Sequence, residues 1–456
     1  MNFFQCQSFE GSAVAAAVRY LVRKAVLKAL QKLTFGRKIP NPNAKSEGLN
    51  WIAARVRILD FVWNSEFGFE EVGLMQKSIA LFVCGLREKG SGARESASVA
   101  GALALLLPWV LACLICGTAF GQTSNLKQDQ DVVFYPAIAY PVEKEKWEIQ
   151  IHGIVFEPEK RVIPLALLRQ LLALDHIHFT AAENTLFKER ARLFMVDEKG
   201  GRRIVIRLAD KNYKIGRSQP NGHFMGKLTF SDSEIKNLRS KGTQFTLVLP
   251  RKDERVFTGE IQFLEDAGVI VISDIDDTIK ITSVGDRHAT LRNTFLLPFQ
   301  PVPGMAELYR GWAEANHAEF FYVSASPWQL YSPLAEFIRS NSFPAGAFFL
   351  KNVDLKDKTF FALFQSPDQY KPGVIEPLMK QFPHHKFILV GDSGEKDPEI
   401  YAALARKYPE QVGHIFIRDL SSGTENAERF EKVFEGLAPE LWKAFHEPSE
   451  IPRTVP

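Results

Sequence analysis

The sequence predicts two folded domains of different class: an α/β domain built on a parallel sheet in residues 266–422, and an all-β, sandwich-like domain in residues 130–265. From residue 266 onward, apolar runs alternate with polar loops and helical segments, the order that produces a parallel sheet covered by helices. Between residues 130 and 265, short runs alternate apolar and polar residues, as antiparallel sheets do. A helical tail is predicted in residues 423–456.

The length and composition are those of a globular protein with more than one domain. A chain of 456 residues is too long for one ordinary core, so a body of two domains is expected. The 56 basic residues nearly balance the 53 acidic ones, which argues against a protein that binds nucleic acid. The last of the four cysteines is Cys116, so the chain beyond it has no disulfide, zinc–thiolate site or cysteine nucleophile.

An uncharged, mostly apolar run at residues 99–121 predicts a signal peptide or membrane anchor, which we place at residues 97–121. A buried core helix is the alternative. Basic residues precede the run, so we expect the carboxyl-terminal body to be exported or membrane-anchored, outside the cytoplasm. Residues 1–96 form a poorly defined leader. Residues 1–74 are either the product of an over-extended gene model or a separate amphipathic region, with a basic amphipathic helix at residues 13–33.

Short runs of alternating polarity define the strands expected in the sandwich-like domain. They lie at residues 147–156, 192–196, 203–208, 223–230, 244–249 and 256–263. Residues 163–173 have helical periodicity and are predicted to cross one end of the sandwich. His152, His176 and His178 lack partner carboxylates at a metal-binding spacing, so we expect structural or lipid-facing histidines.

The first predicted strand of the α/β domain, residues 268–273, ends in a pair of aspartates. Its continuous aliphatic character predicts burial on both faces. Asp274 and Asp276 are two residues apart, so they point to the same side of the strand end, where ligands bind in open α/β sheets. One such carboxylate can attack phosphorus while the other transfers protons. A calcium loop does not fit, because the sixth position lacks glycine and the twelfth lacks glutamate.

Two further polar side chains stand at the ends of predicted elements. Residues 320–323 predict a strand that ends in Ser324, whose hydroxyl can bind a phosphate oxygen. Lys371 opens a predicted helix, where an ammonium group can neutralise the charge of aspartates and phosphate. Taken singly, Ser324 can equally be a helix cap and Lys371 a solvated side chain.

The last predicted strand of this group, residues 387–390, leads into a second acidic segment. Asp392 is a suitable Mg²⁺ ligand beside Asp274. Asp397 would orient Lys371 or a metal-bound water. The acids assigned to the metal site and its immediate surroundings are Asp274, Asp276, Asp392 and Asp397.

Four motifs in this order, an aspartate pair, a serine, a lysine and a closing acidic motif, resemble those of the haloacid dehalogenase superfamily. More narrowly, the segments SDIDDTIKIT, NTF…PVPGMAELY, YVSASPWQLY and LVGDSGEKDPEIY resemble the actin-patch-associated phosphatidate phosphatase family, which is related to the lipins. The resemblance covers roughly residues 266–420. The preceding sandwich is similar in position to the family's amino-terminal region.

The resemblance implies a haloacid-dehalogenase-like sheet, Mg²⁺ as cofactor, and hydrolysis of phosphatidic acid to diacylglycerol and phosphate through an aspartyl-phosphate intermediate. Its motifs also imply a role for individual residues. These are Asp274 as nucleophile, Asp276 as acid and base, Thr278 as support of the loop and a substrate-binding residue, Ser324 as phosphate contact, Lys371 as charge stabiliser and Asp392 as metal ligand.

Residues 285–299 lie between the first two motifs, where this superfamily places flaps or caps. Arg287, His288 and Arg292 are expected to bind a phosphate head group. The apolar side chains expected to face acyl chains are Phe295, Leu296, Leu297 and Phe299. An ordinary amphipathic cap helix would show the same pattern.

The expected partner is a phospholipid, phosphatidic acid, at a membrane surface. A phosphatase of soluble phosphomonoesters would use the same core and is one alternative. A catalytically silent lipid-binding module, as in lipin-like domains of transfer proteins, is another, although the presence of both Asp274 and Asp276 argues against it. Protein partners are left unknown by the sequence.

Overall fold

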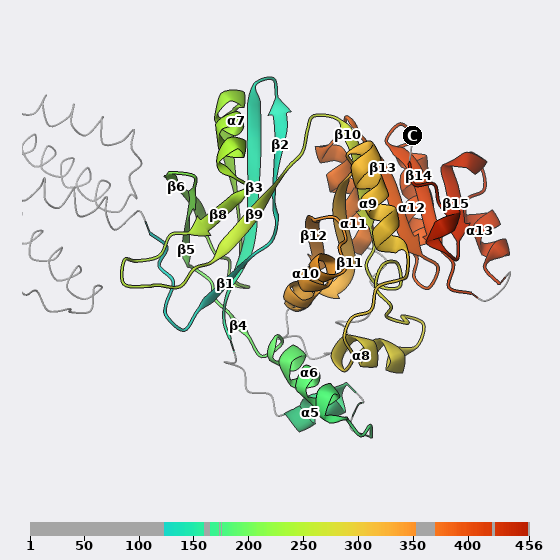
Figure 1. The fold of residues 1–456 in the computed structure, drawn as a ribbon, viewed down its shortest axis with the longest axis horizontal. Helices are drawn as coiled ribbons and strands as arrows, with labels where there is room; N and C mark the ends of the chain where they lie inside the picture. The colour runs from blue at the N-terminus through green and yellow to red at the C-terminus, as the bar shows by residue number, and fades with distance from the viewer. Residues whose placement is uncertain are drawn as a thin grey trace, which may run out of the picture. The chain divides into compact units, whose positions relative to one another are not determined.

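The computed structural model contains two β-sheets, each with its own hydrophobic core (Figure 1). The structure describes residues 123–158, 165–172, 174, 176–352, 370–421 and 425–454. The leader and the predicted signal peptide or anchor at residues 97–121 lie outside these ranges, so export stays a prediction. Among the helices that the structure describes, none combines the length and the apolar character needed to cross a bilayer.

The first sheet has nine strands, connected in the order β1-β3-β2-β9-β8-β5-β6, with β4 and β7 also paired to β3. In the long strand β3, every second side chain from Trp147 to Ile151 is buried in the core of this sheet, as the alternation predicts. The strands are β1 (Asp131–Phe134), β2 (Ala137–Glu143), β3 (Lys146–Glu157), β4 (Asp197–Glu198), β5 (Arg203–Leu208), β6 (Lys211–Arg217), β7 (His223–Ser231), β8 (Gln244–Leu247) and β9 (Thr258–Phe263). Helix α7 (Asp232–Lys241) follows β7.

The nine strands form one curled sheet whose two parts are joined through β9: its first half pairs with β8, its second half pairs with β2, and both parts contribute to one core. The sandwich-like arrangement stays a prediction. The hydrogen-bonded path is continuous, and it includes one parallel pair, β2 with β9. Strand β6, at one end of the path, also approaches β7. A Cβ atom on Gly226 of β7 would lie only 2.4 Å from the carbonyl oxygen of Ile215 in β6, so glycine is needed at this contact.

The second sheet is entirely parallel, with strand order β12-β11-β10-β13-β14-β15. Its central strand β10 alternates between two cores: Val271 packs on one face, and Ile270 and Ile272 on the other. The strands are β10 (Gly268–Ser273), β11 (Glu319–Pro327), β12 (Gly346–Lys351), β13 (His385–Asp392), β14 (Val412–Arg418) and β15 (Trp442–Phe445). The main helices are α8 (Arg287–Phe295), α9 (Met305–Asn316), α10 (Tyr331–Ser340), α11 (Tyr370–Gln381), α12 (Asp397–Lys407) and α13 (Ala427–Val433). The predicted parallel α/β domain is therefore present.

Two helices inserted between β3 and β4 leave the first sheet and join the core of the α/β domain. They are α5 (Leu165–Leu171), predicted from its periodicity, and α6 (Ala181–Arg192), and Figure 1 shows both beside α8. Residues 192–196 were predicted as a strand, which is wrong. Residue 192 ends α6, and Phe194 packs against Phe295 of α8. The apolar alternation there reflects burial between helices rather than a sheet.

The carboxyl-terminal segment is not only helical, as the sequence predicted. It contains α13, but β15 then adds a sixth strand to the parallel sheet and pairs with β14. Phe445 at the end of β15 is buried in the core. A strand of four residues is too short for its alternation to be recognised in the sequence.

Candidate active site

The side chain of Asp274 is buried where the central strand β10 ends. Its amide N–H donates to the carbonyl oxygen of Val390 in β13, which fixes the backbone, and the Thr278 hydroxyl donates to its Oδ2 at 3.2 Å. Burial raises the pKa of Asp274 well above its usual value, although the neighbouring Lys371 acts to lower it. A carboxylate here therefore needs nearby positive charge to stay ionised.

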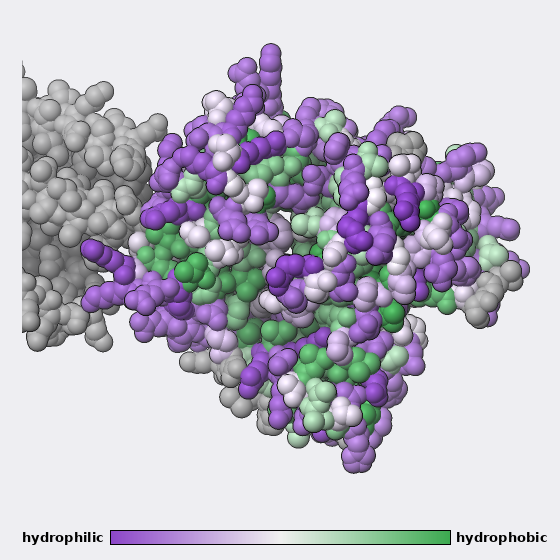
Figure 2. Space-filling model, in the orientation of Figure 1, coloured by the Kyte–Doolittle hydropathy of each residue, from purple (hydrophilic) through white to green (hydrophobic). Residues whose placement is uncertain are grey.

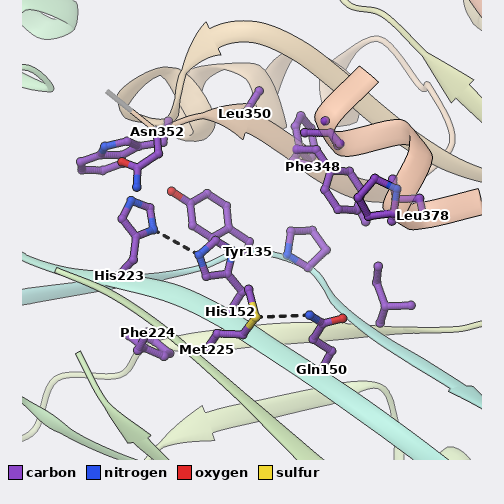
Figure 3. A pocket seen from close by; sticks show the side chains of 18 of the residues that line it. Tyr135, Gln150, His152, His223, Phe224, Met225, Phe348, Leu350, Asn352 and Leu378 are labelled. Atoms are coloured by element: carbon purple, nitrogen blue, oxygen red, sulfur yellow. Dashed lines mark hydrogen bonds between the residues drawn. The ribbon is translucent and has the colours of Figure 1, made fainter. Parts of the chain in front are cut away.

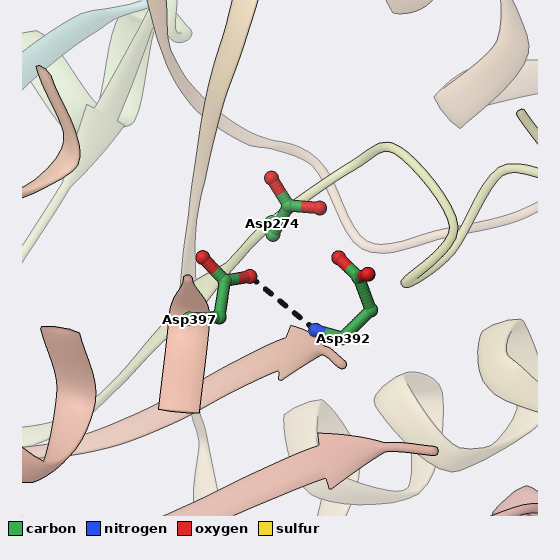
Figure 4. Close-up of side chains that lie close together, drawn as sticks. All are labelled: Asp274, Asp392 and Asp397. Carbon is green, nitrogen blue, oxygen red and sulfur yellow. Dashed lines mark hydrogen bonds between the residues drawn. The ribbon is translucent and has the colours of Figure 1, made fainter. Parts of the chain in front are cut away.

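Asp392 and Asp397 approach Asp274 from neighbouring elements (Figure 4). One carboxylate oxygen from each of the three lies within 4.8 Å of the others. Asp392 ends β13, and Asp397 begins α12 and accepts the N–H of Asp392 at 3.3 Å. This packing requires a glycine at position 391, because a Cβ there would lie 2.3 Å from an oxygen of Asp397. Three acids from separate segments thus converge at the carboxyl edge of the sheet.

Lys371, in the first turn of α11, is the positive partner of this cluster. Its Nζ lies 2.9 Å from Oδ1 of Asp274 and 2.9 Å from Oε2 of Glu395, and it also pairs with Asp397. Burial lowers the pKa of Lys371, but the surrounding carboxylates outweigh that effect and raise it well above its usual value. Glu395, which the sequence analysis did not select, therefore belongs to the site.

The acidic cluster fits a divalent cation. The Oδ2 atom of Asp392 is buried and has no hydrogen-bond partner among the described residues, while its Oδ1 accepts the N–H of Gly394 at 2.7 Å. Burial raises the pKa of Asp392 well above its usual value. One lysine faces several buried acids, so a cation bound by hard oxygen ligands such as Asp274 and Asp392 would supply the missing positive charge. Asp397 is already engaged by Lys371 and by a backbone N–H.

The carboxylate of Asp276 is engaged in a separate network. Its Oδ1 lies 2.7 Å from Nζ of Lys280 and accepts the hydroxyl of Thr282, and its Oδ2 accepts the hydroxyls of Ser324 and Ser326, both at 2.9 Å. Burial raises the pKa of Asp276, but Lys280 and these hydrogen bonds outweigh burial and lower it to about 2. Both oxygens are engaged in this network, and Asp276 is not among the three acids whose carboxylate oxygens converge.

Two residues of the Asp276 network, Lys280 and Ser326, were not predicted from the sequence as site residues. Lys280 is 2% exposed, and its only sequence signal is the spacing of four residues from Asp276. Ser326 stands two residues after Ser324 in β11, on the same side of the strand, and this alternation would have revealed it. Ser324, predicted to contact phosphate, here supports Asp276.

Asp277 shapes the loop that follows the aspartate pair. It adopts a left-handed conformation with φ of 55°, and its carboxylate accepts the backbone N–H groups of Thr282, Ser283 and Val284. Arg418 of β14 donates to its carbonyl oxygen at 2.6 Å. The side chain is thereby turned away from Asp274 and Asp276, as the strand alternation predicts.

The residues predicted to bind substrate do not converge with the acids. Thr278 is fully buried and donates to Asp274, so it supports the loop rather than lining it. Arg292 pairs with Glu183 of α6 at 2.7 Å, and the His288 ring packs edge-on against His176. Arg287 is exposed in the first turn of α8.

The prediction that Phe295, Leu296 and Phe299 face acyl chains is not supported by their positions. Phe295 and Leu296 are buried in the core that α8 shares with α6. The ring of Phe299 packs under the guanidinium of Arg190, whose centre is 3.9 Å from the ring centroid. These buried contacts hold the end of α8 and the residues that follow it against the core.

Comparison with known proteins identifies relatives of the part that carries the site. Residues 269–419 match the family model described as phosphatidate phosphatase APP1, catalytic domain. Phosphatidate phosphatase APP1 of Saccharomyces cerevisiae is 41% identical over 158 residues, which are 34% of this chain and 26% of that protein. An uncharacterised protein of Schizosaccharomyces pombe is 30% identical over 173 residues, 37% of this chain and 28% of that protein. The chain thus matches only about a quarter of the length of each relative.

Proposed function

We propose that this protein is a Mg²⁺-dependent phosphatase that hydrolyses phosphatidic acid to diacylglycerol and phosphate, because residues 269–419 match the family model of the phosphatidate phosphatase APP1 catalytic domain. One observation carries the proposal. Lys371 holds Asp274 at 2.9 Å in a buried acidic cluster, in which an oxygen of Asp392 has no partner among the described residues. This set can bind a cation and a phosphate together, with a carboxylate in place to react.

In the proposed first step, the carboxylate of Asp274 attacks phosphorus and the bond from phosphorus to the lipid oxygen breaks. The products of this step are an aspartyl-phosphate at Asp274 and diacylglycerol, whose oxygen receives a proton from Asp276. In the second step, water attacks phosphorus, Asp276 takes a proton from that water, and phosphate leaves. Asp274 is then free again as a carboxylate.

The environment of Asp276 keeps its side chain in the ionised form that a base needs in the second step, but its low pKa makes it a weak proton acceptor. With a pKa of about 2, its side chain is ionised at neutral pH. The acid role of the first step needs that pKa to rise. A phosphate dianion bound close to Asp276 acts in this direction, because a neighbouring negative charge disfavours the ionised form.

The remaining groups neutralise and orient the substrate. Lys371 supplies a fixed positive charge beside the attacking oxygen of Asp274, and Asp397 and Glu395 hold its ammonium in place. When bound by Asp274 and Asp392, Mg²⁺ would neutralise the negative charge of the phosphate oxygens. Thr278 keeps the Asp274 carboxylate oriented.

The proposal includes a membrane surface as the place of reaction, because phosphatidic acid is a membrane lipid. The uncharged run at residues 99–121 supports an exported or membrane-anchored protein. Amino-terminal sequencing of the mature protein tests this part. A mature chain that begins within residues 1–96 and fractionates as a free cytoplasmic protein would contradict it.

Substrate comparison tests the function itself. The full chain is assayed for phosphate release from long-chain phosphatidic acid in mixed micelles and from glycerol 3-phosphate in solution, each with and without Mg²⁺. We expect Mg²⁺-dependent turnover with a strong preference for the lipid. Equal or better turnover of the soluble ester would favour a soluble phosphomonoesterase. No turnover of either would favour a silent lipid-binding module.

A further inference from the structure

A cavity of about 470 Å³ lies between the curled sheet and the α/β domain. Strands β3 and β7 supply His152, His223 and Met225 on one side, and β12 supplies Phe348 and Leu350 on the other, as Figure 3 shows. Its volume is within the range of roughly 300–1,000 Å³ that is usual for small-ligand sites. Asp274, Asp392 and Asp397 do not line it, so the cavity is separate from the acidic cluster.

The walls of the cavity carry no formal charge. No aspartate, glutamate, lysine or arginine is among the described residues that line it. Its two histidines, His152 and His223, are hydrogen-bonded to each other at 3.1 Å. Burial lowers the pKa of His152 to about 3 and that of His223 to about 4, so both are neutral at physiological pH. The lining also contains the side-chain amides of Gln150, Gln219, Asn221, Asn352 and Gln381, so the walls are uncharged and partly polar, and they disfavour a charged ligand.

Two buried polar atoms of the residues that line this cavity, the Tyr135 hydroxyl and Nε2 of His223, have no hydrogen-bond partner among the described residues. The Tyr135 side chain is 4% exposed, and its hydroxyl has no hydrogen-bond partner among the described residues. The ring is held by His152, with ring centroids 4.7 Å apart, and by Tyr331, at 4.8 Å. Burial raises the pKa of Tyr135, so the hydroxyl stays protonated and can donate. A buried donor without a partner indicates a ligand that brings an acceptor.

The cavity and the acidic cluster meet at the first turn of α11. Tyr370 lines the cavity, and the next residue, Lys371, binds Asp274. On the neighbouring strand, Ser326 binds Asp276 and Trp328 lines the cavity two residues later. Apolar surface also gathers between the two sheets on the face drawn in Figure 2, inside margins that are mostly hydrophilic. A ligand with a phosphate at Asp274 can thus extend its apolar part into the cavity.

We propose that this cavity binds a fatty-acyl chain of the phospholipid substrate, and that the Tyr135 hydroxyl donates a hydrogen bond to the ester carbonyl of that chain. The inference rests on the proposed function, since it assigns a place to the apolar part of the same lipid. An acyl chain with its ester matches two properties of the site: an uncharged wall with a larger apolar than polar part, and the Tyr135 hydroxyl as a buried donor without a partner among the described residues.

Direct binding tests the proposal without requiring turnover. The probe is a lysophosphatidylcholine with a conjugated polyene acyl chain, whose fluorescence rises in apolar surroundings, used below its micelle concentration. It has no phosphomonoester, so it does not report on catalysis. Met225→Trp narrows the cavity at a side chain that is 54% exposed. Val256→Trp is the matched control, because Val256 is 73% exposed in the same domain and does not line the cavity.

We expect saturable binding by the unaltered protein, binding at least about tenfold weaker for Met225→Trp, and no change for Val256→Trp. Tyr135→Phe, which removes only the hydroxyl, should weaken binding by about two- to tenfold. Thermal unfolding checks that each variant is folded. If Met225→Trp does not fold, Gln150→Glu gives the same test, since it adds a charge to the cavity without changing its volume.

Absence of saturable binding, or wild-type affinity in a folded Met225→Trp protein, would overturn the inference. The result of this binding test can be distinguished from the result of the phosphatase assay. A protein that binds the probe but releases no phosphate from phosphatidic acid refutes the phosphatase alone. A protein that releases phosphate but does not bind the probe refutes the acyl site alone.

Discussion

Two sites that meet at the first turn of α11 differ most in their charge. On the side of Lys371, which we call the charged side, the buried acids Asp274, Glu395 and Asp397 surround its ammonium group. On the side of Tyr370, which we call the uncharged side, no aspartate, glutamate, lysine or arginine is among the described residues that line the cavity. A phospholipid has the same division, with a charged head group joined to apolar chains. One turn of helix can therefore separate the binding of the phosphate from the binding of the acyl chain. A substitution that impairs one of these sites should leave the other unchanged.

Asp274→Asn should give the largest effect, confined to the charged side. We expect turnover to fall by on the order of 10⁴-fold or more, because the amide cannot attack phosphorus. Phosphate release from phosphatidic acid measures this. Binding of the polyene lysolipid should be unchanged in the same protein. Wild-type turnover would remove the nucleophile assignment, and loss of lysolipid binding would show that the two sites are not independent.

Asp276→Asn should lower turnover by roughly 10²–10⁴-fold, since the proton transfers to the leaving oxygen and from water are lost. The loss should be greatest for esters with poor leaving groups, which need protonation most. A series of phosphate esters with leaving groups of different pKa measures the slope. Equal slowing across the series would contradict the role of Asp276 as acid.

Asp392→Asn should raise the Mg²⁺ concentration needed for half-maximal activity by at least about tenfold, because it weakens a proposed ligand of the ion. Titration of activity with Mg²⁺ measures the shift. Asp129→Asn serves as control, since Asp129 is exposed and outside the acidic cluster. An unchanged Mg²⁺ requirement in the Asp392 variant would exclude this residue as a ligand.

Much of the charged side could be predicted from the sequence, because strand ends carry a strong signal. Asp274, Asp392 and Asp397 stand directly after or close to continuous apolar runs, and Lys371 opens a helix. The structure brings these four together. Their chemical roles remain proposals that the variants above test.

The uncharged side could not be predicted, because its residues come from segments far apart in the chain. His152 and His223 lie in the first sheet, Tyr135 lies in the connection between β1 and β2, and the cavity forms where these residues pack near β12 and Trp328. His152 was expected to be structural or lipid-facing, and its partner His223 lies 71 residues later in the chain. The placement of α8 was missed for a related reason: Arg292 finds Glu183 in an inserted helix more than a hundred residues earlier.

The neutral histidines make the uncharged side sensitive to acid. In the unfolded chain they protonate near pH 6.5, whereas in the folded protein they do so near pH 3 for His152 and pH 4 for His223. The unfolded state therefore binds more protons as the pH falls below 6.5, and folding stability is lost in that range. We expect a loss of about 2 kcal/mol for each histidine at pH 5. Denaturant unfolding at pH 7 and pH 5 measures it.

His152→Gln is the comparison that isolates this effect from other titrating groups. Its free energy of unfolding should fall less between pH 7 and pH 5 than that of the unaltered protein. An identical pH dependence in both proteins would show that His152 is not kept neutral by burial.

Arg292→Ala should have the smallest effect on activity and stability. Arg292 belongs neither to the acidic cluster nor to the residues that line the cavity. Its side chain is 47% exposed and pairs with Glu183, so we expect at most about 1 kcal/mol of lost stability. The KM for phosphatidic acid should be nearly unchanged. Thermal unfolding and steady-state kinetics measure both. A large rise in KM would restore the head-group contact that the sequence predicted for Arg292.

The central claim, that Asp274 reacts with phosphorus, is tested most directly by trapping the intermediate. The full chain is mixed with phosphatidic acid carrying a radioactive phosphate, quenched in acid after a short reaction with Mg²⁺, and digested. We predict label on the peptide that contains Asp274, released by hydroxylamine and absent from the Asp274→Asn protein. Label on a different residue during active turnover would contradict the account.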